Sequence, residues 1–141
     1  MPVTLKPGAI EFIPNGNPKQ RYGDLKAPMH LSPPVASVHM AEVFRNGADK
    51  YGAYNWRTNP VELMTYLGAI MRHAAAVLDG EWLDPESGKP HLAHVMASAA
   101  IPLDADACGT LNDNRPQAGR AGTLIRTLAE LRKLDAQEKP E

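Results

Sequence analysis

The positions of the prolines set the strongest limit on what this chain can fold into. The sequence has 13 prolines among 141 residues, and they are concentrated outside the apolar stretches. Proline has no N–H and its ring clashes with the preceding helical turn, so it is disfavoured inside helices. The prolines therefore divide the chain into short helical segments. Because short segments enclose only a small core, we expect a partner subunit to complete part of it.

Length, charge and cysteine content define the broad class of protein. The length suits one domain, residues 1–141, and is too short for two ordinary ones. The net charge of −1 gives no overall field that would attract nucleic acid or a membrane surface, so neither is an expected partner. A single cysteine, Cys108, excludes an internal disulfide, and no apolar run approaches the roughly 20 residues of a membrane span. With no signal-like leader, we expect a cytoplasmic protein.

The hydrophobic pattern is that of a helical protein. Apolar residues recur at helical spacing in several stretches, whereas strand signals are nearly absent, so the predicted fold class is all-α. Repeated Pro and Gly in residues 1–33 forbid long helices there, and we expect an extended arm with one short strand or turn; disorder is the alternative. The predicted helices cover residues 34–49, 60–79, 90–102 and 123–134.

The second predicted helix has the clearest start in the chain. Asn59 suits the N-cap and Pro60 the first helical position. Glu62, at the third position, would complete a capping box with Asn59. Gly80 supplies the stop. These signals together predict a helix that begins at Pro60.

Glycine and proline also mark the limits of two other helices. The first helix should end at Gly47 or at the turn that contains Gly52. The third should begin at Pro90, and Pro102 should end it or kink it. We therefore expect Asp104 to follow this helix.

Metal-competent side chains crowd the junction between the second and third predicted helices, residues 79–94, DGEWLDPESGKPHLAH. Carboxylates and imidazoles are ligands that divalent metals prefer, and a bound metal can hold a phosphate. Carboxylates this close repel one another unless a cation compensates. The junction therefore predicts a Mg²⁺ or Mn²⁺ site. The predicted metal ligands are Glu81, Asp84, Glu86, His91 and His94.

Each of these residues also has a plainer interpretation. The carboxylates could form a solvated loop, and Asp84 before a proline is a common turn starter. His91 and His94, at i and i+3, share one helix face and could serve packing or capping. Glu42 and Asp49 lie seven apart on the first helix, where they could be ordinary surface residues or further metal ligands.

A second cluster suggests a nucleotide. Residues 50–57, KYGAYNWR, combine two cations, three aromatics and an Asn. Cations can bind phosphate, the indole can stack on a base, and the amide can hydrogen-bond a base edge. The indole could equally pack in the core, and a cation near the end of the second helix could simply offset the helix dipole. The predicted substrate-binding residues are Lys50, Asn55, Trp56, Arg57 and Arg72.

Several common catalytic motifs are absent from the sequence. There is no glycine-rich phosphate loop, no HExxH and no cysteine-rich zinc pattern. His73 is followed by Ala74, so the His-Asp doublet of the HD-type phosphohydrolases is missing too. These absences exclude the most familiar routes to phosphate and metal chemistry.

Two blocks of the sequence resemble a known family. GADKYGAYNWR (residues 47–57) and MRHAAAVLDGEWLDPESGKPHLAH (residues 71–94), with their spacing, are similar to a phage family of dATP/dGTP diphosphohydrolases. That family resembles the MazG-like all-α nucleotide pyrophosphohydrolases, and its phage (d)GTP pyrophosphohydrolases of the MazZ type are the suggested relatives. The resemblance covers about half of the chain. The usual MazG-like metal signature, EExxE followed by ExxD, does not occur here in that form, which leaves the metal ligands open.

The resemblance implies a function. It implies a helical bundle, a homodimer or homotetramer, that uses Mg²⁺ or Mn²⁺ to hydrolyse a purine (deoxy)nucleoside triphosphate, dGTP or GTP first, to the monophosphate and pyrophosphate. If the gene is carried by a phage, the protein would act in the host cytoplasm. The alternatives are another metal-dependent dNTP phosphohydrolase, acting on dATP or releasing phosphate or triphosphate, and a non-catalytic module that binds a nucleotide or a partner. The expected catalytic residues are Glu81, Asp84 and His73.

Overall fold

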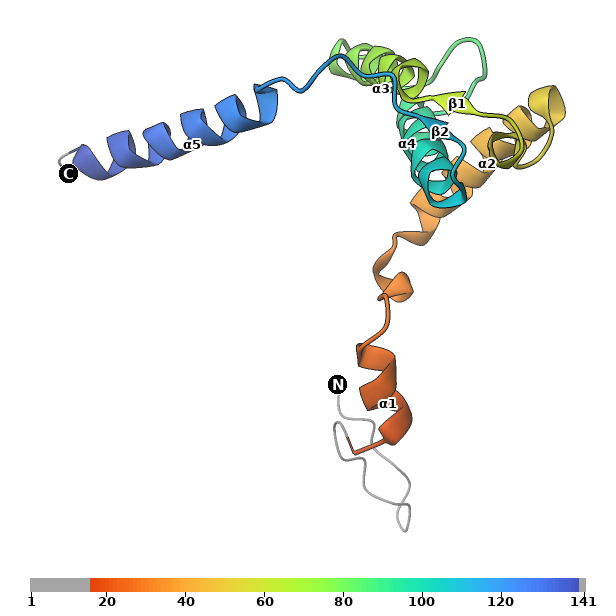
Figure 1. The fold of residues 1–141 in the computed structure, drawn as a ribbon, viewed down its shortest axis with the longest axis horizontal. Helices are drawn as coiled ribbons and strands as arrows, with labels where there is room; N and C mark the ends of the chain where they lie inside the picture. The colour runs from red at the N-terminus through yellow and green to blue at the C-terminus, as the bar shows by residue number, and fades with distance from the viewer. Residues whose placement is uncertain (1–15, 140–141) are drawn as a thin grey trace.

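Three helices form the body of the molecule in the computed structural model, which describes residues 16–139. They are α2 (Pro34–Tyr51), α3 (Leu63–Leu78) and α4 (His91–Cys108), and α4 packs against both of the others (Figure 1). The predicted all-α fold is confirmed, apart from one short strand pair described below. None of the helices in the described part of the chain is long and apolar enough to cross a membrane.

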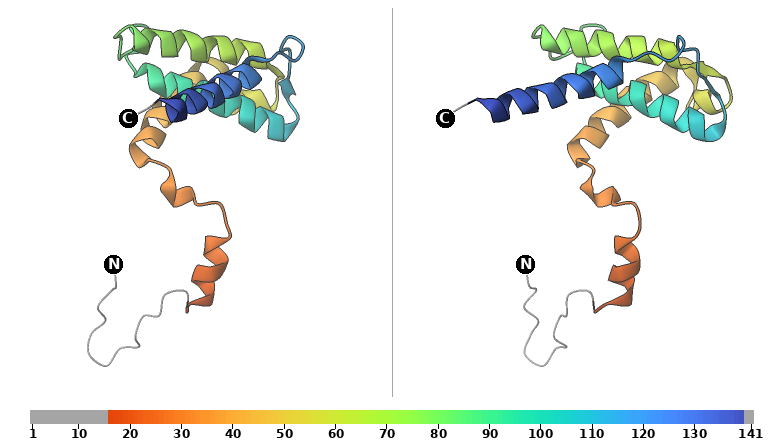
Figure 2. Two further views of the ribbon diagram at one scale, coloured as in Figure 1. Left: turned by 90° about the vertical axis from the view of Figure 1, so that its left-hand side faces the viewer. Right: turned by 60° about the vertical axis from the view of Figure 1, so that its left-hand side comes forward.

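The segment before α2 is partly helical, whereas we expected it to be extended. It contains α1 (Pro18–Asp24) and the 3-10 turn η1 (Met29–Leu31), and both lead away from the three-helix body (Figures 1 and 2). α1 forms because the Asn17 side chain accepts a backbone N–H bond of 2.9 Å and Pro18 occupies the first turn. Proline therefore starts this helix instead of preventing it. Residues 1–15 of the expected arm lie outside the described residues.

α2 begins at Pro34 as predicted and ends two residues later than Asp49. Its C-cap is Gly52, whose φ of 89° is a conformation that glycine adopts without strain. The chain then turns through Tyr54, in the left-handed region at φ 55°, into the 3-10 turn η2 (Asn55–Arg57). The aromatic and cationic loop is thus folded back against the helices.

The start predicted for the second helix is wrong. Val61 and Glu62 form a short strand, β1, that pairs in parallel with β2 (Leu111–Asn112), and α3 begins only at Leu63. The capping box does not form, because Asn59 lies between the 3-10 turn η2 and the strand β1 and is not followed by a helical turn. The predicted stop is confirmed, since α3 ends just before Gly80, which has a φ of 103°.

A residue far along the chain supplies the cap that the local sequence does not. The Oδ1 of Asn114 accepts the backbone N–H of Met64 at 2.9 Å. The Nδ2 of the same amide donates to Glu62 Oε2 at 3.0 Å. Asn114 therefore satisfies a free N–H in the first turn of α3. Its two hydrogen bonds also connect the segment after β2 to the start of α3.

α4 runs through Pro102, where we predicted an end or a kink. The helix continues to Cys108 and ends at Gly109, with φ 75°. Pro102 is buried, and the packing of α4 against α2 and α3 outweighs the loss of one helical hydrogen bond. Asp104 consequently lies within α4 rather than after it.

The hydrophobic core of the described residues is small. Its buried apolar side chains are Val61, Ala93, Ala97, Pro102 and Ala105, and no large side chain in residues 16–139 is fully buried. The last helix, α5 (Ala121–Glu138), is longer than predicted and projects from the body (Figures 1 and 2). Its leucines are largely exposed.

Candidate functional site

The loop between α3 and α4 is held in a tight turn. Leu83 and Pro90 form an antiparallel bridge, and the Asp84 N–H donates to Lys89 O at 2.8 Å. The Gly88 N–H closes the turn on Asp84 O at 2.7 Å, with Gly88 at φ 69°. The turn brings the side chains of the DPESG segment against the first turns of α4.

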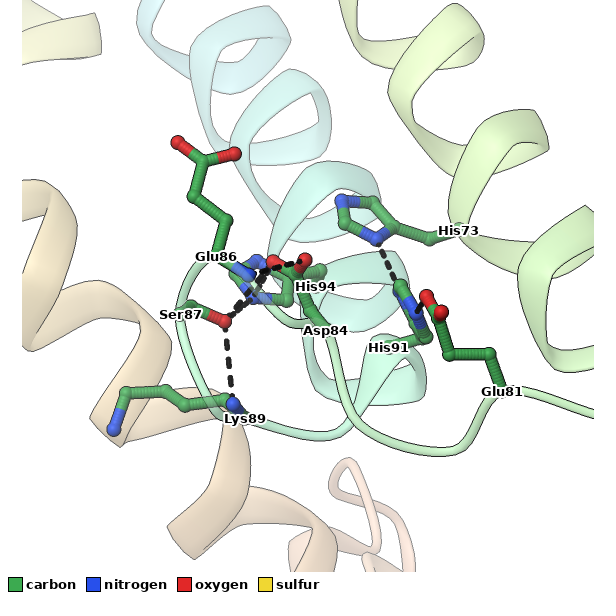
Figure 3. Close-up of polar contacts among 8 residues, drawn as sticks. All are labelled: His73, Glu81, Asp84, Glu86, Ser87, Lys89, His91 and His94. Atoms are coloured by element: carbon green, nitrogen blue, oxygen red, sulfur yellow. Dashed lines mark hydrogen bonds and ion pairs between the residues drawn. The ribbon is translucent and has the colours of Figure 1, made fainter.

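A chain of hydrogen bonds connects Glu81, His91 and His73 (Figure 3). His91 Nε2 lies 2.7 Å from Glu81 Oε1, and His91 Nδ1 lies 2.8 Å from His73 Nδ1. His91 is only 4% exposed and is the one buried polar residue among those described. Both of its ring nitrogens are therefore occupied by protein partners.

A second set of contacts joins Asp84, Ser87 and His94. The Ser87 hydroxyl donates to Asp84 Oδ2 at 3.0 Å and lies 2.7 Å from His94 Nε2, which is itself 3.4 Å from Asp84 Oδ2. Burial raises the pKa of Asp84, but hydrogen bonds from the Glu86 N–H and the Ser87 hydroxyl outweigh it, so the net pKa is lowered. Asp84 is thus held as a carboxylate.

The two sets meet where His73 stacks on His94. The ring planes are 6° from parallel and the centroids are 4.6 Å apart. Burial, followed by the neighbouring imidazole, lowers the pKa of His73. Burial also lowers the pKa of His94, although Asp84 opposes that shift. Both rings are consequently neutral near pH 7 and able to accept a proton.

A polar cavity of about 790 Å³ lies beside this cluster, between α2, α3 and the loop. Two cationic side chains reach its wall, Lys50 from α2 and Arg72 from α3. Its other polar and charged residues are Asn46, Asp49, His73, Asp84, Glu86, Ser87, His91 and His94. The wall therefore combines cations that can bind an anion with carboxylates that can bind a cation.

An apolar cavity of about 510 Å³ adjoins the polar cavity. The two share wall residues Val43, Gly47 and Tyr51. The remaining wall of the apolar cavity includes Phe44, Tyr54, Asn55, Trp56, Tyr66, Ala97, Ser98 and Ile101. An elongated ligand with one charged end and one flat, apolar end would fit both.

The structure brings most of the predicted site residues to these cavities, with two exceptions. Arg57 lies outside both walls, because its guanidinium forms a bidentate pair with Asp104, at 2.8 and 2.9 Å. Glu81 also lies outside the polar cavity and reaches it only through His91. Trp56 lines the apolar cavity, but its Nε1 donates to Asp104 at 2.6 Å and its ring packs against Phe44. Trp56 is therefore a half-buried wall residue of the apolar cavity, held in place by Asp104 and Phe44.

Sequence reasoning did not single out Ser87, Tyr66 or Asp104. Ser87 stands within the DPESG segment, so its position among carboxylates was the available signal. Tyr66 and Asp104 carry no such signal, because each is an ordinary residue within a helix. Their contribution depends on which helix faces they occupy.

The positions of the carboxylates and imidazoles can be compared with the ligands that the predicted Mg²⁺ or Mn²⁺ needs. Among the described residues, no three His, Cys, Asp or Glu side chains are grouped so as to hold an ion. Mg²⁺ does not require such a group, because it commonly takes one or two carboxylates, several waters and the phosphates of a substrate. Asp84 and Glu86, on the wall of the polar cavity, fit that arrangement, and Asp49 adds a third carboxylate to the same wall. Glu42 lies elsewhere and pairs with Arg45 at 3.4 Å.

Fold and site together define an all-α protein with adjoining charged and apolar cavities. A family model described as "dATP/dGTP diphosphohydrolase, N-terminal" matches residues 16–115. The chain belongs to the dATP/dGTP diphosphohydrolase family. No curated protein matches the chain, and no solved structure does.

Proposed function

We propose that the protein hydrolyses a purine nucleoside or deoxynucleoside triphosphate, dGTP or GTP before dATP, to the monophosphate and pyrophosphate, with Mg²⁺ or Mn²⁺. The family supports the reaction class. The observation that carries the proposal is that the two cavities adjoin along a shared wall, one with cations and carboxylates and one aromatic. Preference for guanine rests on the resemblance to the MazZ-type phage enzymes.

The triphosphate would occupy the polar cavity. Lys50 and Arg72 approach it from different helices, so they can offset charge on two sides of a phosphate chain. Asp84 and Glu86 would repel a bare triphosphate, and they become favourable only with a cation between them and the phosphates. When bound, a divalent ion would neutralise phosphate charge and polarise the phosphoryl group under attack.

The base would occupy the apolar cavity. Tyr51, on the wall shared by both cavities, is suited to contact the sugar or the first phosphate, and Tyr54 can contact the ring. Asn55 can hydrogen-bond a base edge. The hydroxyl of Ser98, on the same wall, can donate or accept a second hydrogen bond.

The reaction would be attack of water between the α- and β-phosphates. An electron pair of the water oxygen forms the new bond to the α-phosphorus, and the bond from that phosphorus to the α–β bridging oxygen breaks, so that pyrophosphate departs with this oxygen. His73, neutral near pH 7, would take the proton from the water. Lys50 and Arg72 would offset the negative charge that develops on the departing pyrophosphate.

A nucleotide panel tests this proposal. The full chain is incubated with each dNTP and NTP in the presence of Mg²⁺ or Mn²⁺, and the products are separated. We expect pyrophosphate and monophosphate, fastest from dGTP, and loss of turnover in EDTA. Release of inorganic phosphate or triphosphate would indicate another phosphohydrolase reaction, and nucleotide binding without turnover would indicate a non-catalytic module.

Substitutions on the cavity wall locate the site. Glu86→Gln keeps the size of an exposed side chain that makes no structural ion pair, and we expect it to raise the Mg²⁺ concentration needed for half-maximal rate. Asp84→Asn should have a larger effect, because it also weakens the turn that Asp84 organises. Asp106→Asn, an exposed carboxylate at the far end of α4, is the matched control. Full activity of the Glu86 and Asp84 variants would show that the metal lies elsewhere.

We propose that the active form is a homodimer or homotetramer. The small core and the exposed leucines of α5 support a partner subunit, because burying Leu124, Leu128 and Leu131 would remove a large apolar area from water. Light scattering coupled to gel filtration should give a mass at least twice that of the chain. Leu128→Glu should lower that mass, and a monomeric wild-type chain at all concentrations would refute the assembly.

A further inference from the structure

We propose that Glu81 and His91 act as a positioning pair that fixes the tautomer of His73. In this tautomer Nδ1 carries the proton and Nε2 presents its lone pair to the polar cavity. The role differs from metal binding, which the sequence suggested for Glu81 and His91. The role of this lone pair as the base that takes a proton from water rests on the proposed function. The assignment of the tautomer does not.

The direction of both hydrogen bonds follows from the carboxylate of Glu81, which stands at one end of the chain of contacts. An ionised carboxylate can only accept, so the contact of 2.7 Å requires a proton on His91 Nε2. A neutral imidazole carries one proton, so His91 Nδ1 is then an acceptor. The contact of 2.8 Å between the two Nδ1 atoms therefore requires the proton to be on His73. His73 Nε2 is left unprotonated.

The geometry makes this arrangement rigid. The His91 N–H donates to Trp82 O at 3.0 Å, and the Glu81 N–H donates to Ala76 O at 2.9 Å, so both backbones are held at the helix ends. His91 is 4% exposed, which prevents water from replacing either contact easily. Its ring nitrogens have no lone pair left for a metal. In Figure 3 the second nitrogen of His73 points away from His91.

His73 itself is on the wall of the polar cavity, where a nucleophilic water would sit. When Nε2 takes the proton of that water, the His73 ring becomes an imidazolium and keeps its Nδ1–H bond to His91. The negative charge of Glu81 stabilises this cation through His91, in the way that a base is oriented by a third group in catalytic triads. His94, whose ring stacks on that of His73, is the other imidazole in contact with it.

Nitrogen NMR of the full chain, with ¹⁵N-labelled histidine, reads the tautomer without any need for activity. Near pH 7 the ring of His73, assigned by its loss in His73→Asn, should be in the Nδ1–H form. Glu81→Gln introduces an amide that can donate as well as accept, and Glu81→Ala removes the partner. We expect both variants to give a mixture of the two tautomers, whereas Asp79→Asn, which alters a neighbouring carboxylate, should leave the form unchanged.

A wild-type His73 in the Nε2–H form would overturn the proposal, and so would an unchanged tautomer in both Glu81 variants. The kinetic counterpart is a fall in kcat of roughly 10-fold or more in Glu81→Gln, with little change in KM, because Glu81 does not line the cavity. If the wild-type chain hydrolyses no nucleotide, the proposed function fails, and the NMR measurement still decides the tautomer. If it does hydrolyse nucleotides and the tautomer is the opposite one, only the positioning role fails.

Discussion

The imidazole rings of His73 and His94 lie parallel, with centroids 4.6 Å apart, although one projects from α3 and the other from α4. Stacking of two such rings is favourable while they are neutral and unfavourable when both are charged. The carboxylate of Asp84 raises the pKa of both rings, and the guanidinium of Arg72 lowers the pKa of His73. The site is therefore sensitive to protons in the range where histidine titrates.

Stability should decrease on mild acidification. Burial lowers the pKa of His73 and His94 below the ordinary value of 6.5, so just below that pH the unfolded chain binds more protons than the folded one. The free energy of unfolding should therefore fall as the pH drops below 6.5, and level off once the folded rings titrate. Urea denaturation at a series of pH values measures this free energy of unfolding. His94→Asn should flatten the dependence, and His30→Asn, on the arm, should not.

Arg72 should contribute to substrate binding more than Arg57 does. Arg72→Ala removes a charge from the wall of the polar cavity, and we expect kcat/KM to fall ~10–100-fold, the usual cost of a charged hydrogen bond. Arg57→Ala deletes the same charge outside the cavities but also releases Asp104, so Arg21→Ala, an exposed arginine on α1, is the control for net charge. Steady-state kinetics on dGTP compares the three variants. Equal losses in Arg72→Ala and Arg21→Ala would mean that Arg72 acts only through the net charge of the protein.

Asp104 should anchor the wall of the apolar cavity. Hydrogen bonds from Arg57 and Trp56 lower the pKa of Asp104 to about 2, so the contacts persist above its ordinary value of 3.8 and are lost as the pH falls toward 2. Asp104→Ala should lower the Tm by several degrees and raise KM, because Trp56 loses its anchor. Thermal scans of this variant and of Asp106→Ala, which lacks these partners, test the idea. Similar Tm values for the two would contradict it.

Asn114 should stabilise α3 although it lies 50 residues from the N–H that it caps. Asn114→Ala should cost about 1 kcal/mol of unfolding free energy, the typical value of an N-cap. Chemical denaturation gives the difference. Asn112→Ala, which removes an exposed amide of the neighbouring strand, is the matched control. If only Asn112→Ala lowered the free energy of unfolding, the strand pair, and not the cap by Asn114, would be what stabilises the start of α3.

Local signals predicted helix ends well where glycine was involved. Gly52 and Gly80 stand at the ends of α2 and α3 with positive φ, a conformation that the residue type itself favours. Signals at helix starts were less informative. Asn59 and Glu62 had the residue types of a capping box, but pairing of Val61 with Leu111 replaced that helical turn with a strand. Such a pairing spans 50 positions and leaves no trace in the local sequence.

In the candidate site, too, features that depend on neighbouring residues were predictable, and features that depend on distant residues were not. Residue types in the 79–94 junction predicted the location of Asp84, Glu86, His91 and His94 near one cavity, because they are adjacent in sequence. Their roles could not be predicted. Whether His91 offers a lone pair to a metal depends on Glu81 and His73, and the second of these belongs to another helix.

The expected division into short helical segments is wrong, because α2, α3, α4 and α5 have 16 to 18 residues each and α4 contains Pro102. By itself the sequence determined the helical class, the glycines at the ends of α2 and α3, and the gathering of carboxylates and imidazoles in one loop. These properties depend on residue type and on spacing within one or two helical turns. Only the tertiary structure decided that His73 meets His91 and His94, and that Trp56 is tied to Asp104 at a separation of 48 residues. The reason is physical: the packing of α4 against α2 and α3 sets which helix faces meet, and that packing depends on contacts distributed along the whole chain.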